Sequence, residues 1–196
     1  MFEKTVLGFR SVSLCAASLL LGVGAAHAAG AGPLNTALKA FTSSNTGKIV
    51  WIVPGVIKHN NMSTDFLCTS LEAPGVNADI GVEVFDIDGT QLNAVDGSIA
   101  IPTSTCPTGA VLNVPSGSTV TIGLTGTAQL HEDCKIGLGA VSQGSARIVS
   151  TSSKVFCDAI TLDAKHQVAD PALCSTCPPP PVASLKVMKP KKQSGD

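Results

Sequence analysis

Short apolar runs rich in Val, Ile and Thr follow one another from Lys48 to Leu162, and Gly, Pro, Asn, Asp or Ser closes each run. This punctuation is typical of an all-β domain. The clearest alternation lies in residues 78–86, where Ile80, Val82 and Val84 share one face that should be buried. The pattern predicts strands at Lys48–Ile57, Thr64–Leu71, Ala78–Asp86, Gln91–Val95, Gly97–Ile101, Ala110–Val114, Thr119–Leu124, Cys134–Val141, Ser145–Ser150 and Lys154–Leu162.

Two local signals refine this picture. Pro54-Gly55 interrupts the first run and indicates an edge strand or a bulge, because proline cannot donate to a strand ladder. Asp86-Ile87-Asp88-Gly89 predicts a hairpin turn. Roughly nine short strands over residues 48–163 favour a sandwich of two antiparallel sheets, with a partly closed barrel as the alternative.

The first 28 residues are typical of a secretory signal peptide. Lys4 and Arg10 precede a short apolar stretch that ends in Ala26-His27-Ala28, a pattern that a signal peptidase accepts. We therefore expect a mature chain that starts at Ala29 and is periplasmic, cell-surface or secreted; an uncleaved anchor is the alternative. No later segment is apolar enough over about 20 residues to form a transmembrane helix.

The two ends of the expected mature chain differ from its middle. Residues 29–47 are small and polar with Phe41 as the one large apolar side chain, and we interpret them as a flexible N-terminal arm. Residues 164–196 contain Cys174-Ser175-Thr176-Cys177, then four prolines and several lysines. We interpret the end as a flexible, Pro-rich, basic tail, with a final edge strand over 183–188 as the alternative.

Cysteine usage agrees with export. Six of the seven cysteines follow the leader, and an even number in an exported chain favours disulfides. Six thiols can pair in many ways. We favour a Cys68–Cys157 pair, because both residues lie inside expected strands, and Cys106–Cys134 and Cys174–Cys177 as the other two. For Cys174-x-x-Cys177, a metal half-site or a redox centre remain alternatives to a local disulfide.

Other chemistry has little support in the sequence. The chain has a formal net charge of −1, and Arg147 is its only arginine after the leader, so it has no electrostatic footprint for nucleic acid. His59, His131 and His166 share no short spacing that would suit zinc. The Asp86-x-Asp88-Gly89 segment lacks the remaining ligands of a calcium loop.

Hydrolase signals are also weak. No Gly-x-Ser-x-Gly motif is present. Glu72, Glu83 and Glu132 could pair as acid and base, but a glycosidase groove usually also presents aromatic platforms, and Trp51 is the only tryptophan in a chain without tyrosine. Within Ile49-Val50-Trp51-Ile52-Val53, this side chain is expected in the core.

Three segments together resemble the immunoglobulin-like domains of bacterial exported proteins: Phe66-Leu67-Cys68-Thr69-Ser70, the strand from Ile80 that ends in Asp86-x-Asp88-Gly89, and Val114-Pro115-Ser116-Gly117-Ser118 leading into the next strand. The resemblance covers about residues 48–163. It implies an immunoglobulin-like sandwich and carries over no catalytic residue.

These observations lead to two functional hypotheses. We expect a non-enzymatic exported protein that serves as a structural, surface or protein-interaction module, with no catalytic, cofactor or metal site and with an unknown protein partner. The alternative is a periplasmic thiol-redox or metal-binding protein that acts through Cys174 and Cys177.

Overall fold

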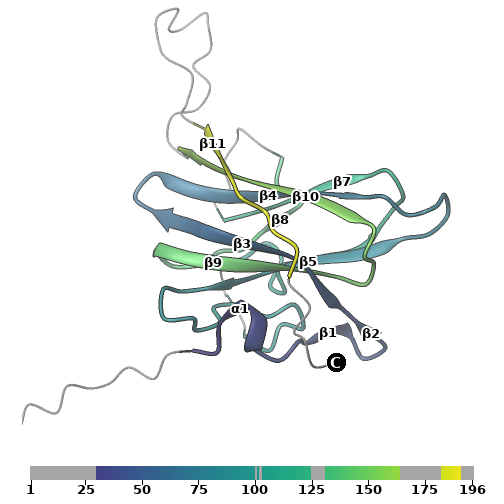
Figure 1. Cartoon of the computed structure of the whole chain (residues 1–196), viewed down its shortest axis with the longest axis horizontal. Coiled ribbons are helices and arrows are strands. Elements are labelled where there is room, and N and C mark those ends of the chain that lie inside the picture. The colour runs from purple at the N-terminus through teal and green to yellow at the C-terminus, as the bar shows by residue number, and fades with distance from the viewer. Residues whose placement is uncertain (1–29, 100, 102, 125–130, 164–181, 191–196) are drawn as a thin grey trace, which may run out of the picture.

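Strands make up nearly all of the regular structure in the described part of this chain (Figure 1). The computed structural model describes residues 30–99, 101, 103–124, 131–163 and 182–190. One short helix, α1 (Gly32–Asn35), precedes the strands. The strands are β1 (Ala40–Thr42), β2 (Asn45–Thr46), β3 (Lys48–His59), β4 (Met62–Ser70), β5 (Ala78–Phe85), β6 (Ala110–Val114), β7 (Thr119–Gly123), β8 (Cys134–Lys135), β9 (Val141–Ser150), β10 (Val155–Asp163) and β11 (Val182–Leu185). The predicted all-β fold class is confirmed.

The large sheet divides into two halves at the β3–β4 hairpin. Strands β3 and β4 pair only at Lys58↔Ser63 and His59↔Met62, next to their turn. Beyond that point β3 pairs with β9, which continues to β5 and β6, whereas β4 lies between β10 and β7. All of these pairs are antiparallel, and the two-residue β8 lies parallel to β7.

One hydrophobic core lies between the two halves. Its fully buried side chains come from both, among them Phe66 of β4, Ile122 of β7, Ile80 of β5 and Ile148 of β9. The register of β3 against β9 shifts between Pro54 and Val56, which confirms the predicted bulge.

Two disulfides cross-link the domain, one between strands β4 and β10 in the core and one between a loop and β8. Cys68 and Cys157 are direct partners in the β4–β10 pair, with Cα atoms 4.1 Å apart, and both are buried in the core. Cys106 and Cys134 join the loop before β6 to β8, with Cα atoms 5.2 Å apart. Both match the favoured pairing, while Cys174 and Cys177 lie outside the described residues.

The expectation of a flexible N-terminal arm is wrong for residues 30–47, and the cause is a buried ion pair. Arg147 on β9 and Glu83 on β5 are both fully buried on the outer face of their sheet half, with Nε and Oε2 2.5 Å apart. A buried guanidinium needs acceptors for its remaining N–H groups.

The arm supplies those acceptors. Arg147 Nη1 donates to Pro33 O at 3.0 Å and to Thr36 O at 2.6 Å, and Nη2 donates to Ala37 O at 3.1 Å. Phe41 packs in a second apolar cluster with Val149. Because the arm covers this face, β5 is buried on both sides, whereas the alternation predicted only one buried face.

The flexible-tail interpretation is wrong for residues 182–190, and the alternative of a final strand is the correct one. Strand β11 pairs with β10 from Leu162↔Val182 to Ala159↔Leu185. The chain then reaches β3, where Met188 and Ile52 exchange backbone hydrogen bonds of 2.8 and 2.9 Å. We call residues 182–188 the C-terminal strap, since it links β10 to β3 (Figure 1, yellow).

Local bonds explain where the other strand predictions succeed and fail. Strand β6 matches the predicted Ala110–Val114. The predicted strand at 97–101 is wrong in its described part, because turn bonds such as Gly97 N to Ala94 O take its place. The predicted strand at 91–95 is reduced to a single β-bridge, between Phe85 and Gln91. The predicted strand at 134–141 is reduced to the two residues of β8.

Candidate functional site

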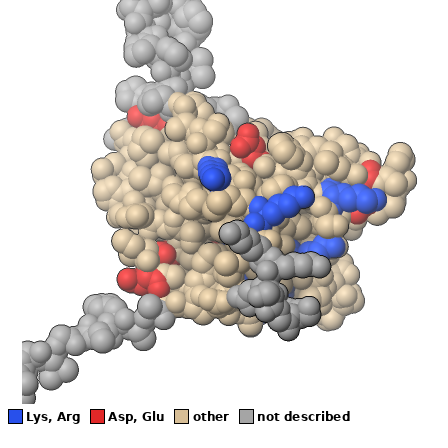
Figure 2. Space-filling view, in the orientation of Figure 1, with Lys and Arg blue, Asp and Glu red and all other residues tan. Residues whose placement is uncertain are grey.

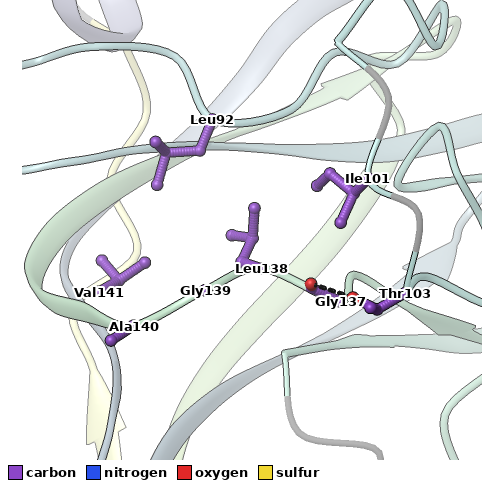
Figure 3. A pocket seen from close by; sticks show the side chains of 8 residues that line it. All are labelled: Leu92, Ile101, Thr103, Gly137, Leu138, Gly139, Ala140 and Val141. Carbon is purple, nitrogen blue, oxygen red and sulfur yellow. Dashed lines mark hydrogen bonds between the residues drawn. The ribbon is translucent and has the colours of Figure 1, made fainter.

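An apolar pocket of about 370 Å³ opens beside the start of β9 (Figure 3). Leu92, Ile101, Leu138 and Val141 extend into the same space from three separate segments of the chain. Thr103, Gly137, Gly139 and Ala140 complete the lining. Because Gly139 and Ala140 are exposed, the pocket opens to solvent along this backbone segment.

The loop that forms one wall is held away from a strand conformation by close contacts with the opposite wall. Thr103 Oγ1 donates to Gly137 O at 2.5 Å, and Gly137 N donates to Ser104 Oγ at 2.7 Å. A Cβ on residue 137 would collide with Thr103, so this approach requires glycine. The Cys106–Cys134 disulfide ties the same two segments together.

Lys58 fixes the backbone of the same wall. Its Nζ donates to Leu138 O at 2.6 Å. Burial of the ammonium group, followed by the positive charge of Lys135, lowers the pKa of Lys58, while the charge of Glu132 opposes this shift. The lysine therefore serves as a cross-link between β3 and residues 137–140.

The pocket suits binding better than chemistry. None of its described lining residues carries an ionisable side chain, and its polar groups are the Thr103 hydroxyl and backbone amides. Sites that bind apolar groups combine such a lining with a few polar groups at fixed positions.

Comparison of the chain with protein-family models, with curated proteins and with solved structures found no match.

The three glutamates considered as acid and base do not come together. Glu83 pairs with Arg147. Glu72 accepts a hydrogen bond from the Ser152 hydroxyl and lies 3.3 Å from Lys154 Nζ; the Ser152 bond is the main cause of its lowered pKa. Glu132 lies beside a different carboxylate, that of Asp65 on β4.

The candidate metal residues are also separate. His131 is exposed and lies 3.5 Å from Asp133. Within the residues that the structure describes, no three His, Cys, Asp or Glu side chains form a metal-binding group. His166, Cys174 and Cys177 lie outside those residues. No helix in the described ranges is long and apolar enough to cross a membrane.

The Asp86-x-Asp88-Gly89 segment forms the predicted turn. Asp86 Oδ1 accepts hydrogen bonds from Asp88 N and Thr90 N, at 3.0 and 2.8 Å. Trp51 is only half-buried, in contrast to the expected core position. Its Nε1 donates to Val155 O at 2.9 Å, and Lys189 Nζ lies 5.5 Å from the ring centroid.

Sequence reasoning missed the pocket because it assigned the Gly137-Leu138-Gly139-Ala140 segment to a strand. Two glycines in four residues were the available signal, since glycine within a strand pattern often marks a close backbone approach. The second wall, from Ile101 and Thr103, could not be placed from the sequence.

Proposed function

We propose that this protein is a non-enzymatic exported module that binds another protein by taking its apolar side chains into the pocket of Figure 3. The observation that carries the proposal is an open apolar pocket without ionisable lining groups, on a wall fixed by a disulfide and by Lys58. A volume of about 370 Å³ lies at the small end of the range for ligand pockets and admits one or two large side chains.

The charge distribution supports a protein partner over a nucleic acid. On the face shown in Figure 2, lysine, aspartate and glutamate side chains are scattered over a mostly uncharged surface. Nucleic-acid binding relies on a continuous positive surface that contacts several phosphates. A pocket with an apolar lining instead gains free energy by removing a partner's apolar surface from water.

The experiment is a selection of peptides followed by a matched pair of variants. Random peptides displayed on phage are selected on the immobilised chain from Ala29 to Asp196, and fluorescence anisotropy gives the Kd of each selected peptide. We expect apolar peptides whose binding weakens at least tenfold in Ala140→Arg, which places a charge at the pocket mouth. Ala73→Arg changes another exposed alanine and should bind as the wild type does.

Either of two results would reject the pocket as the binding site. One is a set of selected peptides that bind Ala140→Arg and the wild type equally. The other is a selection that enriches only charged peptides, whose binding falls with salt and is unaffected by the variant.

Export is part of the same proposal, with a leader that ends at Ala28 and a mature chain that starts at Ala29. The two disulfides support it, because oxidising compartments form and keep such bonds. The intact mass of the exported protein should correspond to a chain that begins at Ala29. Exported material that keeps Met1 would contradict this.

We also propose that the domain has an immunoglobulin-like architecture. The antiparallel strand pairing around one core is compatible with it.

The alternative function is a redox or metal role of Cys174 and Cys177. It predicts that this cysteine pair is easily reduced or loaded with metal. Counting free thiols in the denatured protein tests it: full oxidation of all six cysteines favours the binding module.

A further inference from the structure

A second hollow in the surface, of about 210 Å³, lies around Trp51 at the start of β3. Three separate segments form it: residues 48–51, Ser153 in the turn between β9 and β10, and Lys189 and Pro190, which follow the C-terminal strap. We call it the Trp51 pocket. It shares no lining residue with the pocket of Figure 3. Because its volume lies below the range of about 300 to 1,000 Å³ for drug-sized ligands, it suits a molecule of one substituted ring.

Trp51 gives this pocket an apolar wall of fixed orientation. Its indole Nε1 donates to Val155 O at 2.9 Å, and the side chain packs against the core. Since this bond uses the only hydrogen-bond donor of the indole, Trp51 offers a ligand its ring surface. Pairs of aromatic rings attract each other beyond the effect of the area that they bury. The wall therefore favours a ligand with a planar aromatic ring.

The pocket also has a positive charge. Lys48 and Lys189 line it, and none of its described lining residues is acidic. Both lysines are exposed, and neither forms an ion pair with an Asp or Glu in the described part of the chain. Lys189 Nζ lies 5.5 Å from the centroid of the Trp51 ring, and an ammonium group on one side of a ring keeps N–H donors for an acceptor on its other side. The exposed hydroxyl of Ser153 adds a further donor.

We propose that the Trp51 pocket binds a small aromatic carboxylate, a planar ring that carries one carboxyl group. The ring packs against Trp51 and Pro190, and the carboxylate accepts hydrogen bonds from the ammonium groups of Lys48 and Lys189. Such charge-assisted bonds are about twice as strong as neutral ones. An uncharged ring lacks these bonds, and an anion without a ring leaves the apolar wall in contact with water. Only the combination of ring and charge uses both features of the pocket.

The fluorescence of the protein tests this site directly, because Trp51 is the only tryptophan of a chain without tyrosine. Sodium benzoate is titrated into the chain from Ala29 to Asp196 at constant ionic strength. We expect a saturable change in Trp51 emission, whereas collisional quenching would grow without saturation. Acetate, which lacks the ring, and benzyl alcohol, which lacks the charge, should each bind at least tenfold more weakly than benzoate.

Three lysine variants show whether benzoate occupies this pocket. Lys48→Ala and Lys189→Ala should each weaken its binding at least fivefold, because each removes one of the two positive charges. Lys186→Ala is the matched control: it removes an exposed lysine of the C-terminal strap that does not line the pocket, and it should bind benzoate as the wild type does. All three side chains are exposed, so we expect the three variants to have the Tm of the wild type.

Calorimetric titration gives an independent result. The wild type should bind one benzoate per chain, and the Kd should rise with the concentration of potassium chloride, because salt screens exposed charges. The proposal is overturned by a wild type that binds no benzoate in either measurement, by equal binding of benzoate and benzyl alcohol, or by a loss of binding in Lys186→Ala as large as in Lys48→Ala. Ala140→Arg should bind benzoate normally, since the two pockets share no residue, so this site and the peptide-binding pocket are tested separately.

Discussion

The carboxyl group of Asp65 should make the stability of this domain depend on pH. Its folded-state pKa is about 7, raised by burial and by Glu132, whereas an unfolded aspartate titrates near 4. The folded state therefore binds the extra proton between these values, and stability falls as the pH rises from about 4 to about 7. The loss is at most about 4 kcal/mol.

Thermal unfolding between pH 4.5 and 8 measures this effect. The wild type should lose several degrees of Tm over this range, and Asp65→Asn should lose much less, because an amide does not titrate. Parallel curves for the two proteins would show that Asp65 is not the group responsible.

The Glu83–Arg147 pair should matter far more than an exposed ion pair. Replacing Glu83 with alanine leaves a buried guanidinium without its carboxylate, which costs about 3 to 5 kcal/mol. Lys154→Ala is the control: it breaks the Glu72–Lys154 ion pair, in which Lys154 is 62% exposed, and leaves the bond from the Ser152 hydroxyl to Glu72 in place; such pairs contribute about 1 kcal/mol or less. Urea unfolding of both variants gives the comparison, and equal small losses would contradict the expectation.

At the level of elements, the C-terminal strap should stabilise the domain. Leu185 and Val187 pack against the core, and the strap adds backbone bonds to β10 and β3. Ending the chain at Pro181 should therefore lower the free energy of unfolding by about 2 kcal/mol, or roughly 4 to 8 °C in Tm.

Point variants separate packing from chain length in this prediction. Leu185→Ala should reproduce part of the loss, whereas Val182→Ala on the same strand should have little effect, because Val182 is 57% exposed. A chain that ends at Pro190 should unfold as the full chain does. An unchanged Tm after truncation at Pro181 would show that the strap does not contribute to stability.

Local patterns in the sequence were sufficient to predict several elements. The Asp86-x-Asp88-Gly89 turn forms because the Asp86 side chain bonds to the backbone two and four residues ahead. The Pro54-Gly55 bulge and the bounds of β6 follow from local residue preferences as well. The Cys68–Cys157 pair could be favoured because both residues lie in strands with inward-pointing positions.

Contacts between distant residues account for what the sequence left open. Arg147 is separated in the sequence by 64 residues from Glu83 and by more than 100 from the arm carbonyls that it binds. A local sequence pattern therefore could not predict these contacts. Asp65 and Glu132 meet only because β7 places Gly123 between them. Both walls of the pocket likewise become neighbours only in the folded chain.

In the whole molecule, both ends of the described chain cover the sheets. The N-terminal arm lies over the outer face of β5 and β9 through Arg147 and Phe41, and the strap joins β10 to β3. Among the described strands, backbone pairing connects the two sheet halves directly only near the β3–β4 turn. The strap therefore adds a second link between them, and the arm completes the burial of the β5–β9 face.

The Cys68–Cys157 disulfide should contribute the largest share of the covalent stabilisation of this domain. It joins residues 89 apart in the sequence, whereas Cys106 and Cys134 are 28 apart. Restricting the unfolded chain over these loops corresponds to about 4.6 and about 3.6 kcal/mol, respectively. Both cysteines of the first pair are buried in the core, so their replacement by alanine leaves a cavity, whereas in the second pair Cys134 is buried and Cys106 is only partly buried. We expect the double variant Cys68→Ala/Cys157→Ala to lose more stability in urea unfolding than Cys106→Ala/Cys134→Ala.

The second variant, Cys106→Ala/Cys134→Ala, should instead weaken peptide binding, because this disulfide ties the two walls of the pocket together. If the second variant were the less stable one, the rim would contribute more than the core, and the assignment of roles to the two disulfides would be reversed.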